Sequence, residues 1–119
     1  MKSAIVVTIM TLVAASAAVP AAQELSDVRK QEIVYAMYAD YKSDFPEVAD
    51  IDPQEAMRLM KSDRVVFVDT RKPAEMAVSM LPEAVTKEAF LSDIEAYGDR
   101  IVIGYCTISY RSGIFAREM

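Results

Sequence analysis

Two short apolar runs, residues 64–69 and 101–106, stand out along the chain because most of their positions are hydrophobic and many are β-branched. Both runs predict strands, and the near-continuous run over residues 64–69 is typical of a strand buried on both faces of a sheet. Apolar residues recur at helical spacing over residues 53–60, 73–78 and 87–97. The alternation predicts an α/β fold, a mainly parallel sheet flanked by helices.

The helix expected over residues 53–60 has a recognisable N-terminal cap. Asp52 precedes Pro53 and stands three positions before Glu55, a combination that caps a helix N-terminus. Residues 80–82 are expected to form a turn or an edge segment. The positions expected to face the core are Ala56, Met57, Leu59 and Met60 in this helix, and Phe90, Leu91 and Ile94 in the helix over residues 87–97.

Residues 1–21 have the layout of a secretory signal peptide. Lys2 supplies the positive charge, residues 4–13 an apolar run, and residues 14–22 an alanine-rich cleavage region. An uncleaved membrane anchor is the competing interpretation, although the alanine, serine and proline of the second half partition poorly into lipid. We therefore expect an exported, periplasmic protein that leaves the membrane after cleavage, with the anchored form as the alternative.

The segment over residues 22–46 is predicted to be an amphipathic helix that precedes the main domain, residues 47–119. Its apolar positions recur at helical spacing, and their stripe is expected to be a packing surface. These positions are Val28, Val34, Met37, Tyr38 and Tyr41.

Composition narrows the chemistry. The chain has 119 residues, a formal net charge of −5, one cysteine and no histidine. An acidic domain without a basic stripe is not expected to bind nucleic acid or anionic membranes. The absence of histidine excludes Cys–His proteases and histidine-ligated zinc sites, and a single cysteine cannot form an internal disulfide. The sequence contains neither a Gly-rich phosphate loop nor a zinc-spaced cysteine pair.

The cysteine stands where a nucleophile is expected. Cys106 ends the second apolar run, and a polar loop containing Arg111 separates it from a short helix that Ser112 is expected to cap. Backbone N–H groups and the positive end of a helix favour the thiolate, which is the reactive form, so the pKa of Cys106 should lie below its ordinary value. The alternative is that Cys106 is an inert, buried core residue.

These motifs together resemble the rhodanese family of sulfurtransferases over residues 47–119. Asp69-Thr70-Arg71, with Glu75 following, resembles the family's Asp-x-Arg after a core strand, and residues 80–84 resemble a later family segment in their proline and alanine. The run from Cys106 to Ser112 resembles the active loop Cys-x-x-Gly-x-Arg-Ser. The resemblance implies a rhodanese-like parallel sheet, which we expect to be incomplete at its C-terminal end.

The resemblance also implies a mechanism. Cys106 would take a sulfane sulfur from a donor such as thiosulfate, and the resulting persulfide would pass it to a thiol or cyanide. Arg111 would stabilise charge or orient the donor. The reaction would need no metal or organic cofactor. Four residues separate Cys106 from Arg111, one fewer than in phosphatases, which favours sulfur over phosphate. The loop residues expected to bind substrate through their amides or as pocket walls are Thr107, Ile108, Ser109, Tyr110 and Ser112.

Other residues near the loop are expected to be structural. Asp69 would cap the end of its strand, and Arg71 would form an i,i+4 ion pair with Glu75. Ser109 stands in place of the family's glycine, which is costly if the position needs a positive φ. This substitution leaves open a second function, a non-catalytic rhodanese-like module that binds a partner protein or carries sulfur.

Overall fold

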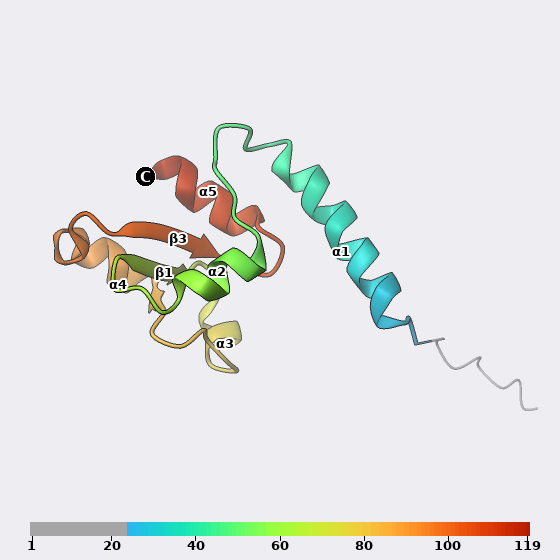
Figure 1. Cartoon of the computed structure of the whole chain (residues 1–119), viewed down its shortest axis with the longest axis horizontal. Helices are drawn as coiled ribbons and strands as arrows, with labels where there is room; N and C mark the ends of the chain where they lie inside the picture. Colours follow the sequence, from blue (N-terminus) through green and yellow to red (C-terminus); the bar gives the residue numbers. More distant parts are fainter. Residues whose placement is uncertain (1–23) are drawn as a thin grey trace, which may run out of the picture.

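The computed structural model describes residues 24–119 (Figure 1). The expected signal peptide, residues 1–21, lies outside the described residues. Within the described part of the chain, no helix is both long and apolar enough to cross a membrane.

A three-stranded parallel sheet forms the centre of the molecule. Its strands are β1 (Val65–Asp69), β2 (Val85–Thr86) and β3 (Ile101–Tyr105), in the order β2-β1-β3. Every residue of β1 is buried, as its unbroken apolar run predicts for a central strand. The predicted α/β fold with a mainly parallel sheet is confirmed.

Two helices supply the main apolar contacts of the sheet. Phe90 of α4 (Lys87–Ser92) and Phe115 of α5 (Tyr110–Glu118) pack edge to face, with ring centroids 5.8 Å apart. Both rings join Val66 and Val68 of β1 in one buried cluster. Since α5 directly follows the Cys106 loop, burial of Phe115 attaches that loop firmly to the sheet.

The segment over residues 87–97 is not one helix, as predicted, but two. Asp93 leaves helical geometry at φ −148° and ψ 57°, and a 3₁₀ turn, η1 (Ile94–Tyr97), follows. Only Phe90 is buried, while Leu91 and Ile94 are exposed. The break at Asp93 ends the helical spacing before Ile94, whereas Leu91 lies within α4 on its exposed side.

The helix α2 (Pro53–Leu59) begins as predicted, with the Asp52 side chain accepting a hydrogen bond of 2.8 Å from the Glu55 amide. None of its residues is buried, however, and Met57 is 68% exposed. Of the positions predicted to face the core, Ala56, Leu59 and Met60 are half-buried and only Met57 is exposed, so this face is partly covered and not fully buried. The short helix α3 (Pro73–Met76) follows β1, and residues 80–82 form no strand.

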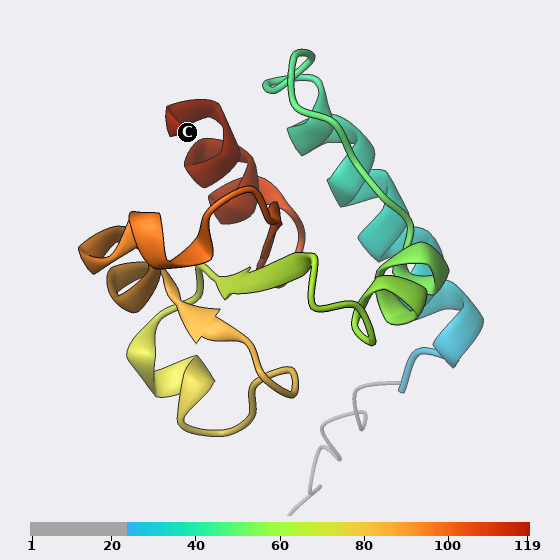
Figure 2. The same cartoon turned by 60° about the vertical axis from the view of Figure 1, so that its left-hand side comes forward.

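The helix α1 (Asp27–Lys42) extends away from the sheet and has no buried residue (Figures 1 and 2). Three apolar positions of its predicted stripe, Val28, Val34 and Met37, are exposed. The helix packs only near its C-terminal end, where the Tyr41 ring lies 5.1 Å from that of Tyr110. The stripe therefore does not form a packing surface along its whole length.

Phe45, just after α1, completes this attachment. Its side chain is buried and lies against Gly113 of α5 so closely that an added Cβ there would come within 2.6 Å of the ring. The Phe45 ring also lies 5.7 Å from that of Tyr110. The glycine therefore permits the close approach that fastens the N-terminal segment to the helix after the Cys106 loop.

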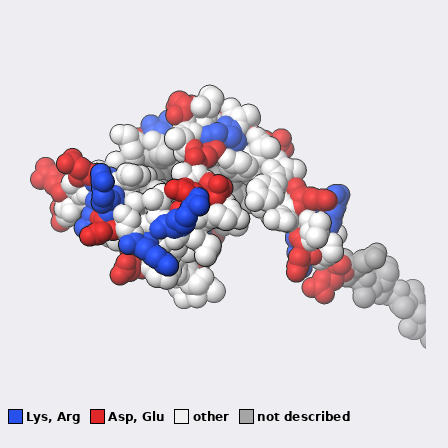
Figure 3. Space-filling model, viewed as in Figure 1, with Lys and Arg blue, Asp and Glu red and all other residues white. Residues whose placement is uncertain are grey.

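Acidic and basic side chains are interspersed over the face of the molecule that Figure 3 presents. On this face they do not separate into a single basic stripe.

Candidate functional site

The candidate site lies where β1 and β3 end. These strands are neighbours and parallel, and Asp69 pairs with Tyr105 in their register. Their carboxyl ends therefore reach the same edge of the sheet, which is where α/β folds place their reactive groups. Thr70 joins the two ends, because its amide and its hydroxyl both donate to the Tyr105 carbonyl, at 3.0 and 2.9 Å. Cys106 directly follows Tyr105, the last residue of β3.

The loop after β3 turns sharply through Ser109, which has a left-handed conformation with φ 69°. The position thus requires the positive φ that glycine adopts without strain. Ser112 is not the helix cap that the sequence suggested, since α5 begins at Tyr110 with Ser109 at its N-terminal boundary. Instead, the buried Ser112 side chain lies in the first turn and donates to the Ser109 carbonyl at 3.2 Å.

This loop surrounds a half-buried sulfur. Cys106 Sγ lies 3.6 Å from Ser112 Oγ. Burial by itself raises the pKa of the thiol, but hydrogen bonds from the amide and hydroxyl of Ser112 act in the opposite direction. The amides of Ile108 and Arg111 add to the second effect, and the pKa of Cys106 lies below its ordinary value. Both the direction and the backbone donors agree with the prediction from sequence, and the Ser112 hydroxyl is an additional donor.

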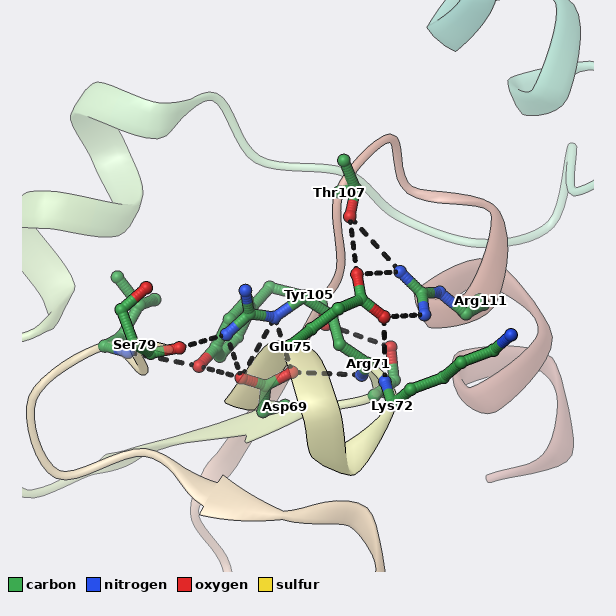
Figure 4. A network of polar contacts seen from close by, with 10 residues as sticks. Asp69, Arg71, Lys72, Glu75, Ser79, Tyr105, Thr107 and Arg111 are labelled. Carbon is green, nitrogen blue, oxygen red and sulfur yellow. Dashed lines mark hydrogen bonds and ion pairs between the residues drawn. The ribbon is translucent and has the colours of Figure 1, made fainter. Parts of the chain in front are cut away.

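Arg111 is held by a carboxylate. Its two terminal nitrogens donate to the two oxygens of Glu75 at 2.6 and 2.9 Å (Figure 4). The Thr107 hydroxyl lies between them, accepting from Arg111 at 3.2 Å and donating to Glu75 at 3.3 Å. The Arg111 guanidinium and the Lys72 amide hold the pKa of Glu75 at about 2.

The ion pair predicted between Arg71 and Glu75 is therefore absent. Arg71 instead forms a bidentate pair with Asp69, with Nη2 to Oδ2 at 2.7 Å and Nε to Oδ1 at 3.0 Å. The i,i+4 rule failed because α3 begins only at Pro73 and the extended Lys72 precedes it, so Arg71 lies outside the helix that carries Glu75.

Asp69 ties several segments together. Its side chain is fully buried and accepts a hydrogen bond of 2.6 Å from the Tyr105 hydroxyl (Figure 4). Arg71, its partner, also donates a hydrogen bond of 2.6 Å to the Ser79 carbonyl. Burial raises the pKa of Asp69, but hydrogen bonds from Arg71 and Tyr105 outweigh it and the pKa lies below its ordinary value. The carboxylate is a structural anchor for both strand ends, consistent with the supporting role expected for Asp69 and Arg71.

Two pockets meet at Cys106 and Thr107. The larger, about 370 Å³, is also lined by Tyr41, Lys72, Ile108, Tyr110 and Arg111. The smaller, about 260 Å³, is also lined by Arg71, Ser79, Met80, Leu81 and Tyr105. Cys106 thus contributes to the lining of both pockets.

The predicted site residues divide into two groups. Thr107, Ile108, Tyr110 and Arg111 line the larger pocket with Cys106. Ser109 and Ser112 line neither pocket; Ser109 forms the turn of the loop, and the Ser112 hydroxyl contacts Cys106 Sγ.

Sequence reasoning missed Tyr41, Lys72 and Tyr105. Lys72 could have been found from its place three residues after the end of β1. Nothing in the spacing of the chain indicated that Tyr41 would reach the loop.

No group of three or more histidine, cysteine, aspartate or glutamate side chains is placed to hold a metal ion within residues 24–119. Scans against models of protein families, against curated proteins and against solved structures found no match to this chain.

Proposed function

We propose that this protein is a rhodanese-like sulfurtransferase that carries sulfur as a persulfide on Cys106. The observation that carries the proposal is the surroundings of the sulfur. Several hydrogen-bond donors of one short loop converge on a thiol that opens into two pockets. Such a loop favours a thiolate, which is the form that attacks sulfane sulfur.

The reaction proceeds in two displacements. The Cys106 thiolate attacks the outer sulfur of thiosulfate, a new S–S bond forms, and the sulfur–sulfur bond of the donor breaks with its electron pair leaving on sulfite. An acceptor thiolate or cyanide then attacks the outer sulfur of the persulfide. The Cys106–sulfur bond breaks, and its electron pair returns to Cys106 as thiolate. Both steps exchange one nucleophile for another and require no cofactor.

The loop serves both steps in the same way. Cys106 is an anion before the first displacement and again after the second, and the Ser112 hydroxyl and loop amides stabilise that anion. Arg111 shapes the wall of the larger pocket together with Glu75 and Thr107. The buried Asp69–Arg71 pair keeps the two strand ends in register beneath the loop.

Sulfur transfer from thiosulfate to cyanide by the purified chain tests the proposal. Cys106→Ser should remove the activity, because a hydroxyl cannot form the persulfide. Ser92→Ala is a matched control on α4, where the Ser92 hydroxyl bonds only within its own helix. Equal rates for the wild type and Cys106→Ser would rule out the mechanism.

A second function is a module that binds a partner or carries sulfur without turnover. The strained Ser109 and the neutralisation of Arg111 by Glu75 favour it. Mass spectrometry after incubation with thiosulfate and with other sulfane-sulfur donors distinguishes the functions. A gain of about 32 Da on Cys106, one sulfur atom, without turnover identifies a carrier. No gain with any donor identifies a binding module.

We also propose that the protein is exported to the periplasm through a signal peptide at residues 1–21. The charged start, apolar run and alanine-rich cleavage region support this. Cell fractionation and N-terminal sequencing of the mature chain would test it. An intact N-terminus in the membrane fraction would indicate an anchor instead.

A further inference from the structure

The larger pocket beside Cys106 contains two cationic side chains that differ in one respect. Arg111 is paired with Glu75 through two hydrogen bonds, so its charge is already compensated. Lys72 lines the same pocket, and within residues 24–119 its ammonium group is in no ion pair. Figure 4 shows the Lys72 side chain extended from the start of α3, with contacts drawn only to its backbone amide.

Glu75 explains why the two cations differ. One of its oxygens accepts from the Lys72 backbone amide at 3.0 Å and also from Arg111 at 2.6 Å. The carboxylate thereby holds Arg111 against the loop while it fixes the backbone of Lys72 at the start of α3. An anion that recruited Arg111 would have to compete with Glu75 for the same N–H groups, whereas Lys72 offers three N–H donors without such a competitor.

We propose that Lys72 is the residue of this pocket that recognises an anionic sulfur donor, one whose transferable sulfur is attached to a charged oxyanion group, as in thiosulfate. The identity of the donor rests on the proposed function; the role of Lys72 in attracting anions to Cys106 does not. Arg111 is then a positioning residue that holds the loop through Glu75. Tyr41 and Tyr110 supply the aromatic walls of the same pocket.

Alkylation of Cys106 tests this role without any sulfur transfer. Iodoacetate carries a negative charge and iodoacetamide does not, so the ratio of their rates reports the charge of the pocket. A change in thiolate fraction alters both rates equally and cancels in the ratio. Lys72→Met, which keeps the length of the side chain, should lower the ratio about threefold to tenfold at low ionic strength, and added salt should diminish the difference.

Two variants serve as controls. Lys72→Arg should restore most of the ratio because it restores the charge. Lys61→Met removes an exposed lysine that lines neither pocket and should leave the ratio unchanged. A Lys72→Met protein with the wild-type ratio would overturn the inference, as would an equal fall in Lys61→Met.

Steady-state kinetics then separate this inference from the proposed function. Lys72→Met should raise KM for thiosulfate severalfold while kcat changes little, since Lys72 does not touch the transferred sulfur in this scheme. A lowered alkylation ratio without any Cys106-dependent transfer would support Lys72 and refute the sulfurtransferase. Transfer with an unchanged ratio and KM would support the enzyme and refute Lys72.

Discussion

Two loops at the same edge of the sheet, residues 70–72 after β1 and residues 106–109 after β3, use the same pair of chemical groups in different ways. Each is held by an arginine and a carboxylate. The Asp69–Arg71 pair is closed, with the Asp69 side chain fully buried and the Arg71 side chain only 17% exposed. The Glu75–Arg111 pair is open, with side-chain exposures of 35% and 31%.

The difference assigns the two pairs to different tasks. A buried carboxylate loses its hydration, so Asp69 depends on the donors that Arg71 and Tyr105 supply. A pair that is one-third exposed is screened by water and contributes little to stability. The β1 loop is therefore a rigid base, and the β3 loop, beside Cys106, is a surface that can meet a ligand.

The largest expected effect comes from breaking the closed pair. Asp69→Ala leaves the Arg71 guanidinium without its partner and the Tyr105 hydroxyl without its acceptor, and should lower the free energy of unfolding by about 3 kcal/mol. Urea denaturation followed by circular dichroism would measure the loss. Tyr105→Phe, which removes one hydrogen bond to the same carboxylate, should cost less. A neutral effect of Asp69→Ala would mean that the closed pair is not the anchor.

The next largest effect concerns the sulfur beside the open loop. Ser112→Ala removes the hydroxyl bonded to Cys106, so the pKa of the thiol should rise and its alkylation by iodoacetamide at neutral pH should slow about tenfold. Arg111→Ala should raise the pKa less, because its amide contributes to the sulfur and remains in place. The pH dependence of alkylation would measure both. A Cys106 that titrates like an ordinary cysteine in all three proteins would be the inert core residue of the alternative interpretation.

A third prediction addresses strain in the β3 loop. Ser109→Gly should raise the free energy of unfolding by about 1 kcal/mol, because glycine adopts its φ of 69° without the cost that a Cβ imposes. Ser109→Ala is the matched control, since it keeps the Cβ and should not stabilise. Equal stabilities for Ser109→Gly and Ser109→Ala would show that strain at this position is negligible. The strain would then no longer favour a non-catalytic module.

The smallest effect is expected from the open pair. The pKa of Glu75 is held at about 2, below the value of about 4.3 for an unfolded chain. Its contribution to stability is therefore present above about pH 5 and is lost as the pH falls towards 2. Glu75→Gln should destabilise the protein slightly at neutral pH and not at all near pH 2. Urea midpoints of the wild type and Glu75→Gln, measured between pH 2 and pH 7, would check this. A difference between the two proteins that does not change with pH would contradict the prediction.

The sequence predicted those features that depend on neighbouring residues. The continuous apolar run of β1 indicated a strand covered on both faces, and the Asp52 cap marked the start of α2. Both signals are local, since they arise from burial along one strand and from hydrogen bonds within one turn. The same reasoning placed Cys106 at the carboxyl end of a strand.

The pairing of charges was decided only by the tertiary structure. Arg71 is four residues from Glu75 but bonds Asp69, while Glu75 bonds Arg111, 36 positions away. Which carboxylate an arginine reaches depends on how β1 and β3 align and where α3 begins, and local spacing carries no information on either. The approach of Tyr41 and Lys72 to the Cys106 pocket has the same cause, because it requires α1, α3 and the β3 loop to be assembled. Sequence therefore determined the strand ends and the position of the thiol, and the packing of distant segments determined which charges surround it.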